Sequence, residues 1–278
     1  MEISVPIKDL HKYRSRLRSP VGLVPTMGYL HKGHLSLVQK ARKECASVVV
    51  SIFVNPTQFA PNEDLDDYPR DLRRDLQLLQ AENIDLIWLP TAEEMYPRGY
   101  QTWVIVEELT LPLEGRFRPE HFRGVTTIVA KLFNCVQPDR AYFGQKDAQQ
   151  VVVVQRMVED LNYPIELVIC PIVREPDGLA MSSRNVHLNS DQRKAATVLY
   201  KSLRKAQKTY QSGRRDAEEL RAAVSSTILE EPLAQLQYVS CTDQNTLVEL
   251  EGEVDRCLLS IAVLFGKTRL IDNIIIGD

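Results

Sequence analysis

The chain has 278 residues, of which 44% are hydrophobic, and its 34 Lys and Arg against 37 Asp and Glu give a formal net charge of −3. This length allows one large domain or two unequal domains with a sizeable core. The near-neutral balance argues against a dedicated nucleic-acid partner, which would require a basic excess or stripe, but it allows a local basic pocket for a small anion.

The cysteines and apolar runs predict a reducing, aqueous environment. Five cysteines lie far apart, with no C-x-x-C pair and no metal-ligand spacing, so we expect reduced, mostly buried thiols and no metal site. The start, MEISVPIKDL, lacks the pattern of a secretory signal. No apolar run reaches the roughly 18 residues that span a bilayer. The sequence thus predicts a cytoplasmic protein with no membrane partner.

The first two thirds of the chain alternate strand-like and helix-like segments. The β-branched run at 48–54 is typical of a central parallel strand, and the apolar steps of three and four after Gly124 indicate one face of a helix. This rhythm predicts an α/β fold, with a Rossmann-like parallel sheet that binds ligands at the carboxyl ends of its strands. Strands are expected at 21–24, 48–54, 85–89, 141–143 and 165–172, and helices from the turn at 25–28 through Arg42 and at 71–83, 125–136 and 147–161.

The pattern changes after about residue 174. Helices followed by strands indicate a smaller α+β unit. We therefore predict a Rossmann-like catalytic domain over residues 1–173 and a smaller α+β C-terminal domain over 174–278. In that second domain, helices are expected at 191–212 and 216–229 and strands at 236–241, 258–265 and 270–276.

The first candidate motif, PTMGYLHKGH at residues 25–34, lies between the first expected strand and helix. A helix N-terminus offers unpaired N–H groups and a partial positive charge, and Gly28 and Gly33 would let a phosphate approach the backbone. His31 and His34 lie three residues apart, so we expect both on one helix face, where they could stabilise charge during phosphoryl or adenylyl transfer. A metal pair, or a surface or capping role, is the alternative for these histidines.

A second motif, FVNPTQF at 53–59, follows the second expected strand. Its Asn55 and Gln58 amides can both donate to and accept from a hydroxy acid. A polar turn around Pro56 is the alternative. The basic stretch at 116–124 could likewise meet a carboxylate or phosphate, or form a solvated loop.

Two more motifs carry cationic groups. In FGQKDAQQ, at 143–150, Gly144 permits close approach and Lys146 is a point charge suited to phosphate. In GLAMSSRN, at 178–185, two hydroxyls and the Arg184 guanidinium suit an oxyanion. The alternatives are a solvated Lys-Asp face and a capped turn before the next helix.

Together these motifs resemble a known family. The T-x-G-x-x-H-x-G-H pattern at 26–34 resembles the HIGH signature of class I aminoacyl-tRNA synthetases and related nucleotidylyltransferases, and Met-Ser-Ser-Arg at 181–184 resembles their KMSKS loop. The combination resembles the pantothenate synthetase (pantoate–β-alanine ligase) family over residues 24–187. The blocks that carry it are PTMGYLHKGH, FVNPTQF, NEDLDDYPR, MYP, LEGRFRPEHFRGV, FGQKDAQQ and VREPDGLAMSSRN.

The resemblance implies a two-step reaction. Pantoate would attack ATP, carried with Mg²⁺, to give pantoyl adenylate and pyrophosphate, and β-alanine would then displace AMP to give pantothenate. It also implies a homodimer. Because the Ser-Ser-Arg loop lies near the domain boundary and exposed adenylates hydrolyse, we expect the smaller domain to cover the nucleotide site. Two alternatives are another HIGH-type adenylyl transferase and a nucleotide sensor without catalytic activity.

Residue roles follow from the same resemblance. It implies that His34 is the acid with His31 as its helper, and that Gln58 contacts pantoate and β-alanine while Gln150 contacts pantoate. Asn55 is a weaker candidate for the substrate pocket, and Asp75 a conceivable contact of the magnesium ion. The further catalytic candidates are Lys146, Ser182, Ser183 and Arg184. The implied ATP-binding residues are Met27, Gly28, Tyr29, Leu30, His31, Lys32, Gly33, His34, Gly144, Gln145, Lys146, Asp147, Val173, Met181, Ser182, Ser183 and Arg184.

Overall fold

A computed structural model describes residues 2–4, 6–60, 63 and 65–277, so Asn62 and Asp64 of the NEDLDDYPR block lie outside the described residues. The chain forms two compact units, one of residues 1–144 and 153–171 and the other of residues 145–152 and 172–278. The segment 145–152 therefore groups with the C-terminal part. In the described part of the chain, no helix is long and apolar enough to cross a membrane.

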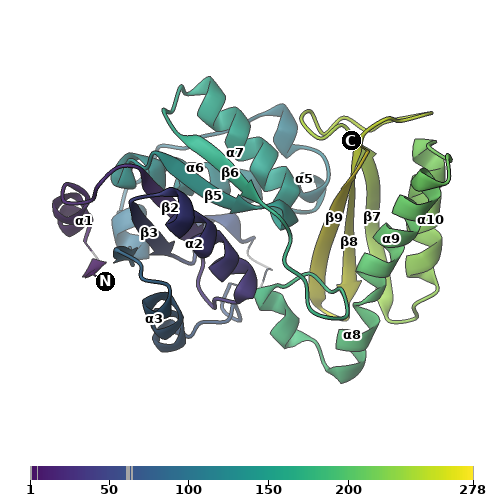
Figure 1. Ribbon diagram of the computed structural model, residues 1–278, viewed down its shortest axis with the longest axis horizontal. Coiled ribbons are helices and arrows are strands. Elements are labelled where there is room, and N and C mark those ends of the chain that lie inside the picture. Colours follow the sequence, from purple (N-terminus) through teal and green to yellow (C-terminus); the bar gives the residue numbers. More distant parts are fainter. Residues whose placement is uncertain (1, 5, 61–62, 64, 278) are drawn as a thin grey trace. The chain divides into compact units, whose positions relative to one another are not determined.

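The larger unit is built on a six-stranded sheet in the order β1-β4-β3-β2-β5-β6, in which every neighbouring pair is parallel. This confirms the predicted Rossmann-like α/β class (Figure 1). The central strands are almost wholly buried, as the β-branched run at 48–54 indicated. The strands are β1 (Glu2–Ser4), β2 (Val21–Thr26), β3 (Ser47–Ile52), β4 (Leu86–Trp88), β5 (Arg140–Gly144) and β6 (Glu166–Cys170).

The helices that follow these strands confirm the expected alternation. The sequence missed the N-terminal strand β1 and helix α1, because β1 is only three residues long and α1 buries a single side chain, Leu10. The α-helices are α1 (Ile7–Arg14), α2 (Lys32–Glu44), α3 (Leu72–Ala81), α4 (Ala92–Met95), α5 (Glu114–Phe117), α6 (His121–Val136) and α7 (Ala148–Asp160). Short 3₁₀ turns form η1 (Pro56–Gln58), η2 (Glu108–Thr110) and η3 (Gln145–Asp147).

The smaller unit packs helices on a three-stranded antiparallel sheet, which confirms the predicted α+β class (Figure 1). Its strands are β7 (Ala234–Thr242), β8 (Cys257–Phe265) and β9 (Thr268–Ile276), and its helices are η4 (Ser183–His187), α8 (Ser190–Ala195), α9 (Val198–Gln211) and α10 (Ala217–Leu229). Its core is one cluster of buried apolar side chains drawn from the helices and the sheet.

The single helix predicted over 191–212 is wrong, because the structure divides it into α8 and α9. The Thr197 N–H and hydroxyl both bond the carbonyl of Lys194, at 3.2 and 2.8 Å. Such contacts to the carbonyl three residues back tighten the backbone and interrupt the α-helical ladder. The fully buried Ala196 lies at the break, so the apolar pattern continued through it and concealed it.

All five cysteines are free thiols, four of them buried and Cys135 partly exposed. This confirms the expectation of reduced, mostly buried thiols.

Candidate functional site

The parallel sheet reverses its strand order between β2 and β5, and candidate motifs begin on both sides of that point. From β2 the chain proceeds outward through β3 and β4, whereas β5 and β6 lie on the other side of β2. In sheets of this kind, ligands bind outside the carboxyl ends of the strands where the order reverses. The segment after β2 opens with Met27, and β5 ends at Gly144. Both candidate motifs therefore start at the position where the topology favours a ligand.

The loop after β2 is held by one buried carboxylate from α3. Asp75, which is 1% exposed, accepts the N–H of Tyr29 at 2.8 Å and the N–H of Leu30 at 2.7 Å, one on each oxygen. Gly28 has a φ of +80°, and a Cβ there would lie 3.1 Å from the Asp75 carboxylate and 3.0 Å from Ile52. The loop therefore requires glycine at this position.

Burial raises the pKa of Asp75, and the N–H groups of Leu30 and Tyr29 act in the opposite direction. Because each carboxylate oxygen bonds the loop backbone, Asp75 supports the loop in this structure, and the magnesium contact considered from the sequence stays a prediction. Among the described residues, no group of three or more His, Cys, Asp or Glu side chains is placed to hold a metal ion.

His31 and His34 lie together, with ring centroids 4.0 Å apart, but not on one helix face. That prediction is wrong because α2 begins at Lys32 and His31 is its N-cap, with extended backbone. His31 Nδ1 accepts the N–H of Gly33 at 3.1 Å, and His34 Nδ1 accepts the N–H of His31 at 3.3 Å, which forms a capping box.

The capping box decides how these two rings can act. Since each Nδ1 is an acceptor, a neutral ring carries its proton on Nε2. Protonation of Nδ1 would set two N–H groups against each other. In the neutral form, both histidines therefore present an Nε2–H donor at a helix N-terminus, where the helix dipole favours an anion.

Gln58 lies in η1, at the carboxyl end of β3, and is 9% exposed. Its Nε2 lies 3.1 Å from the sulfur of Met27 and its Oε1 accepts the Asn55 amide at 3.1 Å. The structure thus brings the second predicted motif against the first within the larger unit.

Asn55 is 1% exposed, and its amide is fully bonded inside the protein. Its Nδ2 donates to Gln58 Oε1 and to the Gly124 carbonyl, at 3.1 Å each. Its Oδ1 accepts the hydroxyls of Tyr96, at 2.8 Å, and Thr57, at 3.0 Å. Burial raises the pKa of Tyr96 to about 12, so that hydroxyl keeps its proton. An amide has two donors and two acceptor sites, so the hydrogen bonds of Asn55 in this structure support Gln58, and its contact with substrate stays a prediction.

The basic stretch that the sequence left ambiguous supports the backbone of Gln58. His121 Nδ1 lies 2.9 Å from the Gln58 carbonyl, and Arg118 donates to the same oxygen at 3.2 Å. Arg118 also forms a bidentate ion pair with Glu63, with both contacts at 2.7 Å. Burial, assisted by the Arg118 charge, lowers the pKa of His121 to about 4. His121 is therefore neutral near pH 7 and donates its Nδ1 proton to the carbonyl.

Gly124, which precedes the apolar part of α6, lies against the backbone of η1. A Cβ at this position would lie 2.5 Å from the Thr57 carbonyl oxygen and 2.7 Å from the Gln58 nitrogen. Helix α6 and η1 can therefore approach only with glycine here. The sequence motif contained this signal, but a close approach between segments so far apart in the chain is not visible without the fold.

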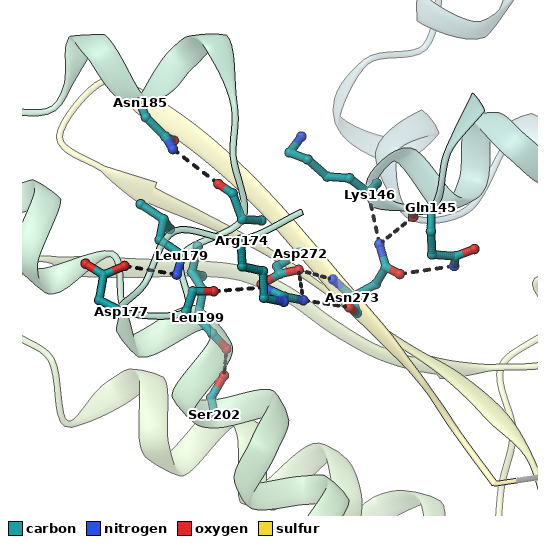
Figure 2. Close-up of polar contacts among 12 residues, drawn as sticks. Gln145, Lys146, Arg174, Asp177, Leu179, Asn185, Leu199, Ser202, Asp272 and Asn273 are labelled. Atoms are coloured by element: carbon teal, nitrogen blue, oxygen red, sulfur yellow. Dashed lines mark hydrogen bonds and ion pairs between the residues drawn. The ribbon is translucent and has the colours of Figure 1, made fainter. Parts of the chain in front are cut away.

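The Lys146 motif forms the turn η3 and the start of α7. The Lys146 ammonium lies 3.6 Å from the Asp147 carboxylate and its side chain is 22% exposed. Gln149 is buried and Gln150 is half-buried in the first turn of α7. The carbonyls of Gln145 and Lys146 accept hydrogen bonds from β9, as Figure 2 shows.

The remaining candidates, Val173 and residues 181–184, lie in a short hairpin of the smaller unit and in the segment directly after it. The Val173 carbonyl accepts the N–H of Met181 at 3.0 Å, next to an antiparallel bridge between Arg174 and Ala180. Ser182 is the N-cap of η4, and its hydroxyl accepts the N–H of Arg184 at 3.3 Å. The structure thus gathers Met27–His34 with Gln58 in one unit, and it places Lys146 and the segment 181–184 in the other.

Three comparisons place these features among known proteins. The family model described as pantoate-beta-alanine ligase matches residues 2–275. The pantothenate synthetase of Roseiflexus sp. (strain RS-1) is 56% identical over 99% of both chains, and that of Chloroflexus aurantiacus (strain ATCC 29366 / DSM 635 / J-10-fl) is 61% identical over 91% of this chain and 90% of its own.

Solved structures give the same result. The crystal structure of pantothenate synthetase from Thermus thermophilus has a TM-score of 0.94 and 47% identity and covers 99% of both chains. The pantoate-beta-alanine ligase of Francisella tularensis, complexed with beta-gamma ATP and beta-alanine, has a TM-score of 0.82 and 38% identity, and the match covers 99% of this chain and 97% of that one.

Proposed function

The chain belongs to the pantoate–β-alanine ligase family, and we propose that this ligase condenses (R)-pantoate with β-alanine through a pantoyl-adenylate intermediate, using ATP as its Mg²⁺ complex. The products are pantothenate, AMP and pyrophosphate. A free carboxylate is a poor acyl donor, and adenylation supplies the leaving group that the amine of β-alanine displaces. The observation that carries this proposal is the capped histidine pair at the helix N-terminus beside the point where the sheet reverses its order.

In the first step, we assign the loop 27–34 to the ATP phosphates. The Nε2–H groups of His31 and His34 would donate to charge that develops as pyrophosphate departs. Since each Nδ1 accepts a backbone N–H, a neutral ring carries its proton on Nε2 and acts as a hydrogen-bond donor. The fixed positive charge would come from Lys146 and Arg184, and the hydroxyls of Ser182 and Ser183 complete the catalytic set.

Gln58 is our candidate for orienting pantoate and then β-alanine, with Gln150 as a second contact to pantoate. The nearly buried Gln58 amide is held from both ends, by Asn55 through its side chain and by His121 and Arg118 through its carbonyl. A pre-positioned group of this kind loses little freedom when it binds substrate. The other ATP contacts that we propose are Gly144, Gln145, Asp147, Val173 and Met181.

Magnesium enters this scheme as part of the substrate. The carboxylate nearest the first loop, Asp75, bonds backbone N–H groups with both oxygens. Mg²⁺ commonly keeps several waters and binds through substrate phosphates. Since both oxygens of Asp75 already bond the backbone, we propose that Mg²⁺ arrives bound to the phosphates of ATP.

The decisive experiment measures pyrophosphate release from ATP with pantoate alone, followed by AMP release after β-alanine is added. Pantoate-dependent pyrophosphate and amine-dependent AMP would support both half-reactions. An adenylyltransferase that retains AMP in its product would release pyrophosphate but no AMP. If pyrophosphate release did not depend on pantoate, the substrate assignment would be wrong.

We also propose that the enzyme is a cytoplasmic homodimer that acts without a nucleic-acid partner. The family resemblance supports the dimer, and the charge of −3 supports the absence of a nucleic-acid partner. Light scattering of the purified protein tests the dimer, and a mass equal to one chain would refute it.

A further inference from the structure

Two consecutive residues of the last strand, Asp272 and Asn273, bind both cationic segments of the smaller unit. Asp272 is 1% exposed and Asn273 is 3% exposed, so both polar side chains are buried in β9. Neither lies in a motif that the sequence singled out. Figure 2 shows the two side chains directed to different segments, Asp272 toward Arg174 and Asn273 toward Gln145 and Lys146.

Asn273 fixes the turn that carries Lys146. Its Nδ2 donates to the carbonyls of Gln145, at 3.1 Å, and Lys146, at 2.9 Å, while its Oδ1 accepts the Gln145 side-chain amide at 3.2 Å. Two consecutive peptide planes are thereby oriented, and they set the direction in which the Lys146 side chain leaves the backbone. In Figure 2 that side chain extends away from Asn273.

Asp272 fixes the hairpin that leads into residues 181–184. It forms a bidentate pair with the Arg174 guanidinium, with contacts of 2.6 and 2.9 Å. The same guanidinium donates to the Gly178 carbonyl at 3.1 Å and lies 3.8 Å from the centre of the Tyr200 ring. Arg174 therefore ties both arms of the hairpin to β9.

The strand geometry explains how one dipeptide serves two segments. Successive side chains of a strand point to opposite faces, so Asp272 shares a face with Leu270 and Ile276 of the core, and Asn273 points the other way. The N–H of Asn273 also donates to Asp272 Oδ1 at 2.8 Å, which links the two side chains. Neighbouring Cα atoms are about 3.8 Å apart, so the two anchoring points cannot move separately by much.

We propose that Asp272 and Asn273 are positioning residues that hold the Lys146 turn and the Ser182–Ser183–Arg184 segment in one fixed arrangement for the adenylation step. The inference rests on the proposed function for its catalytic consequence and on the contacts of β9 for its structural part. Neither residue is assigned a contact with substrate. A shift of about 1 Å in a charged group can lower a rate about 10²-fold, which is why such an anchor matters.

The first test compares Asn273→Asp with Leu270→Ala. The aspartate keeps the shape of the side chain but replaces two donors with an acceptor that faces two carbonyls. Leu270→Ala weakens the buried core on the same strand and removes no side-chain hydrogen bond to either segment. We expect Asn273→Asp to lower kcat for pantoate-dependent pyrophosphate release about tenfold or more below that of Leu270→Ala, with the KM for ATP changed less than about threefold.

Two further variants separate positioning from loss of stability. Asn273→Gln retains the amide and should recover part of the lost rate. Asp272→Asn should affect the hairpin more than the Lys146 turn, because it weakens the pair with Arg174. Equal kcat values in Asn273→Asp and Leu270→Ala would refute the positioning role. It would also be refuted if, across the variants, each fall in kcat were matched by a corresponding fall in Tm.

Hydrogen–deuterium exchange tests the structural part without any substrate. Peptides that cover 145–150 should exchange faster in Asn273→Asp than in the wild type or Leu270→Ala, and peptides that cover 178–186 should exchange faster in Asp272→Asn. Unchanged exchange in both segments would overturn the anchor. A wild-type enzyme without pantoate-dependent pyrophosphate release would instead refute the proposed function, and the exchange data would still decide the role of β9.

Discussion

The two regions that we assign to the ATP phosphates are supported in different ways. The loop 27–34 is held both by the capping box that His31 and His34 form at the start of α2 and by the Asp75 carboxylate of α3. The turn at Lys146 and the hairpin before Ser182 depend on β9, whose contacts with them span 98 to 128 residues of sequence. A motif therefore identifies the candidate reacting groups, whereas distant polar side chains determine where some of these groups are held.

This difference has a consequence for substitutions. A change within the capping box should disturb one loop, whereas a change in β9 should disturb two segments at once. Substitutions at the reacting groups and at their supports should therefore have separable effects in each region.

The largest effect is expected for Lys146→Ala. Removing a positioned charge from a phosphoryl-transfer site costs about 10² to 10³ in rate, and the lysine stem is partly exposed, so stability should change little. The measurement is kcat for pantoate-dependent pyrophosphate release. Lys201→Ala, at an exposed lysine of α9 in the same unit, is the control for loss of one charge and should keep normal kcat. Normal turnover in Lys146→Ala would contradict the assigned role.

In the first region, His34→Gln separates capping from chemistry. A glutamine at this position can still close the capping box but lacks the imidazole donor. We expect kcat to fall about 10²-fold, as for the loss of one oxyanion donor, and Tm to stay nearly unchanged. His34→Ala should show the same loss of kcat and also lose about 1 kcal/mol of stability with the cap. If the Gln variant kept its activity, His34 would be a capping residue alone.

The distant support of the same loop is tested by Asp75→Asn. The amide can accept one of the two backbone N–H groups but turns its own donors toward the other, and a buried donor without a partner costs about 2 kcal/mol. Urea unfolding should show that loss, and the KM for ATP should rise. Asp71→Asn on the same helix is the control, since asparagine caps a helix as well as aspartate does. Equal stability of the two variants would show that the loop does not depend on Asp75.

Much of the fold was predictable because its signals are local. The β-branched run at 48–54 and the apolar steps after Gly124 predicted β3 and α6, and the change of pattern near residue 174 predicted an α+β unit. The break between α8 and α9 was not predictable, because a threonine hydroxyl that bonds the chain three residues back leaves the apolar period intact. The three-residue strand β1 was too short to produce a pattern.

The candidate reacting groups could be proposed from the sequence, whereas the groups that support them could not. Histidine, lysine and glutamine in short motifs are recognisable by their chemistry. The groups that hold them, such as Asp75, His121 and Asn273, lie 45 to 128 residues from the backbone they bind, so the local sequence could not show which backbone they support. Their burial and hydrogen bonds depend on the completed fold.

The smallest effect concerns His121, which supports Gln58 and is surrounded by Arg118, Glu63 and Glu114. Its folded pKa of about 4 lies below the ordinary 6.5, so between these values the unfolded chain binds a proton that the folded chain does not. Stability should therefore fall as the pH is lowered through this window, by about 1 kcal/mol once partial solvent access is allowed for. Urea unfolding of wild type and His121→Asn at pH 7 and pH 4.5 measures this. A pH dependence as steep in the variant as in the wild type would show that His121 is not the titrating group.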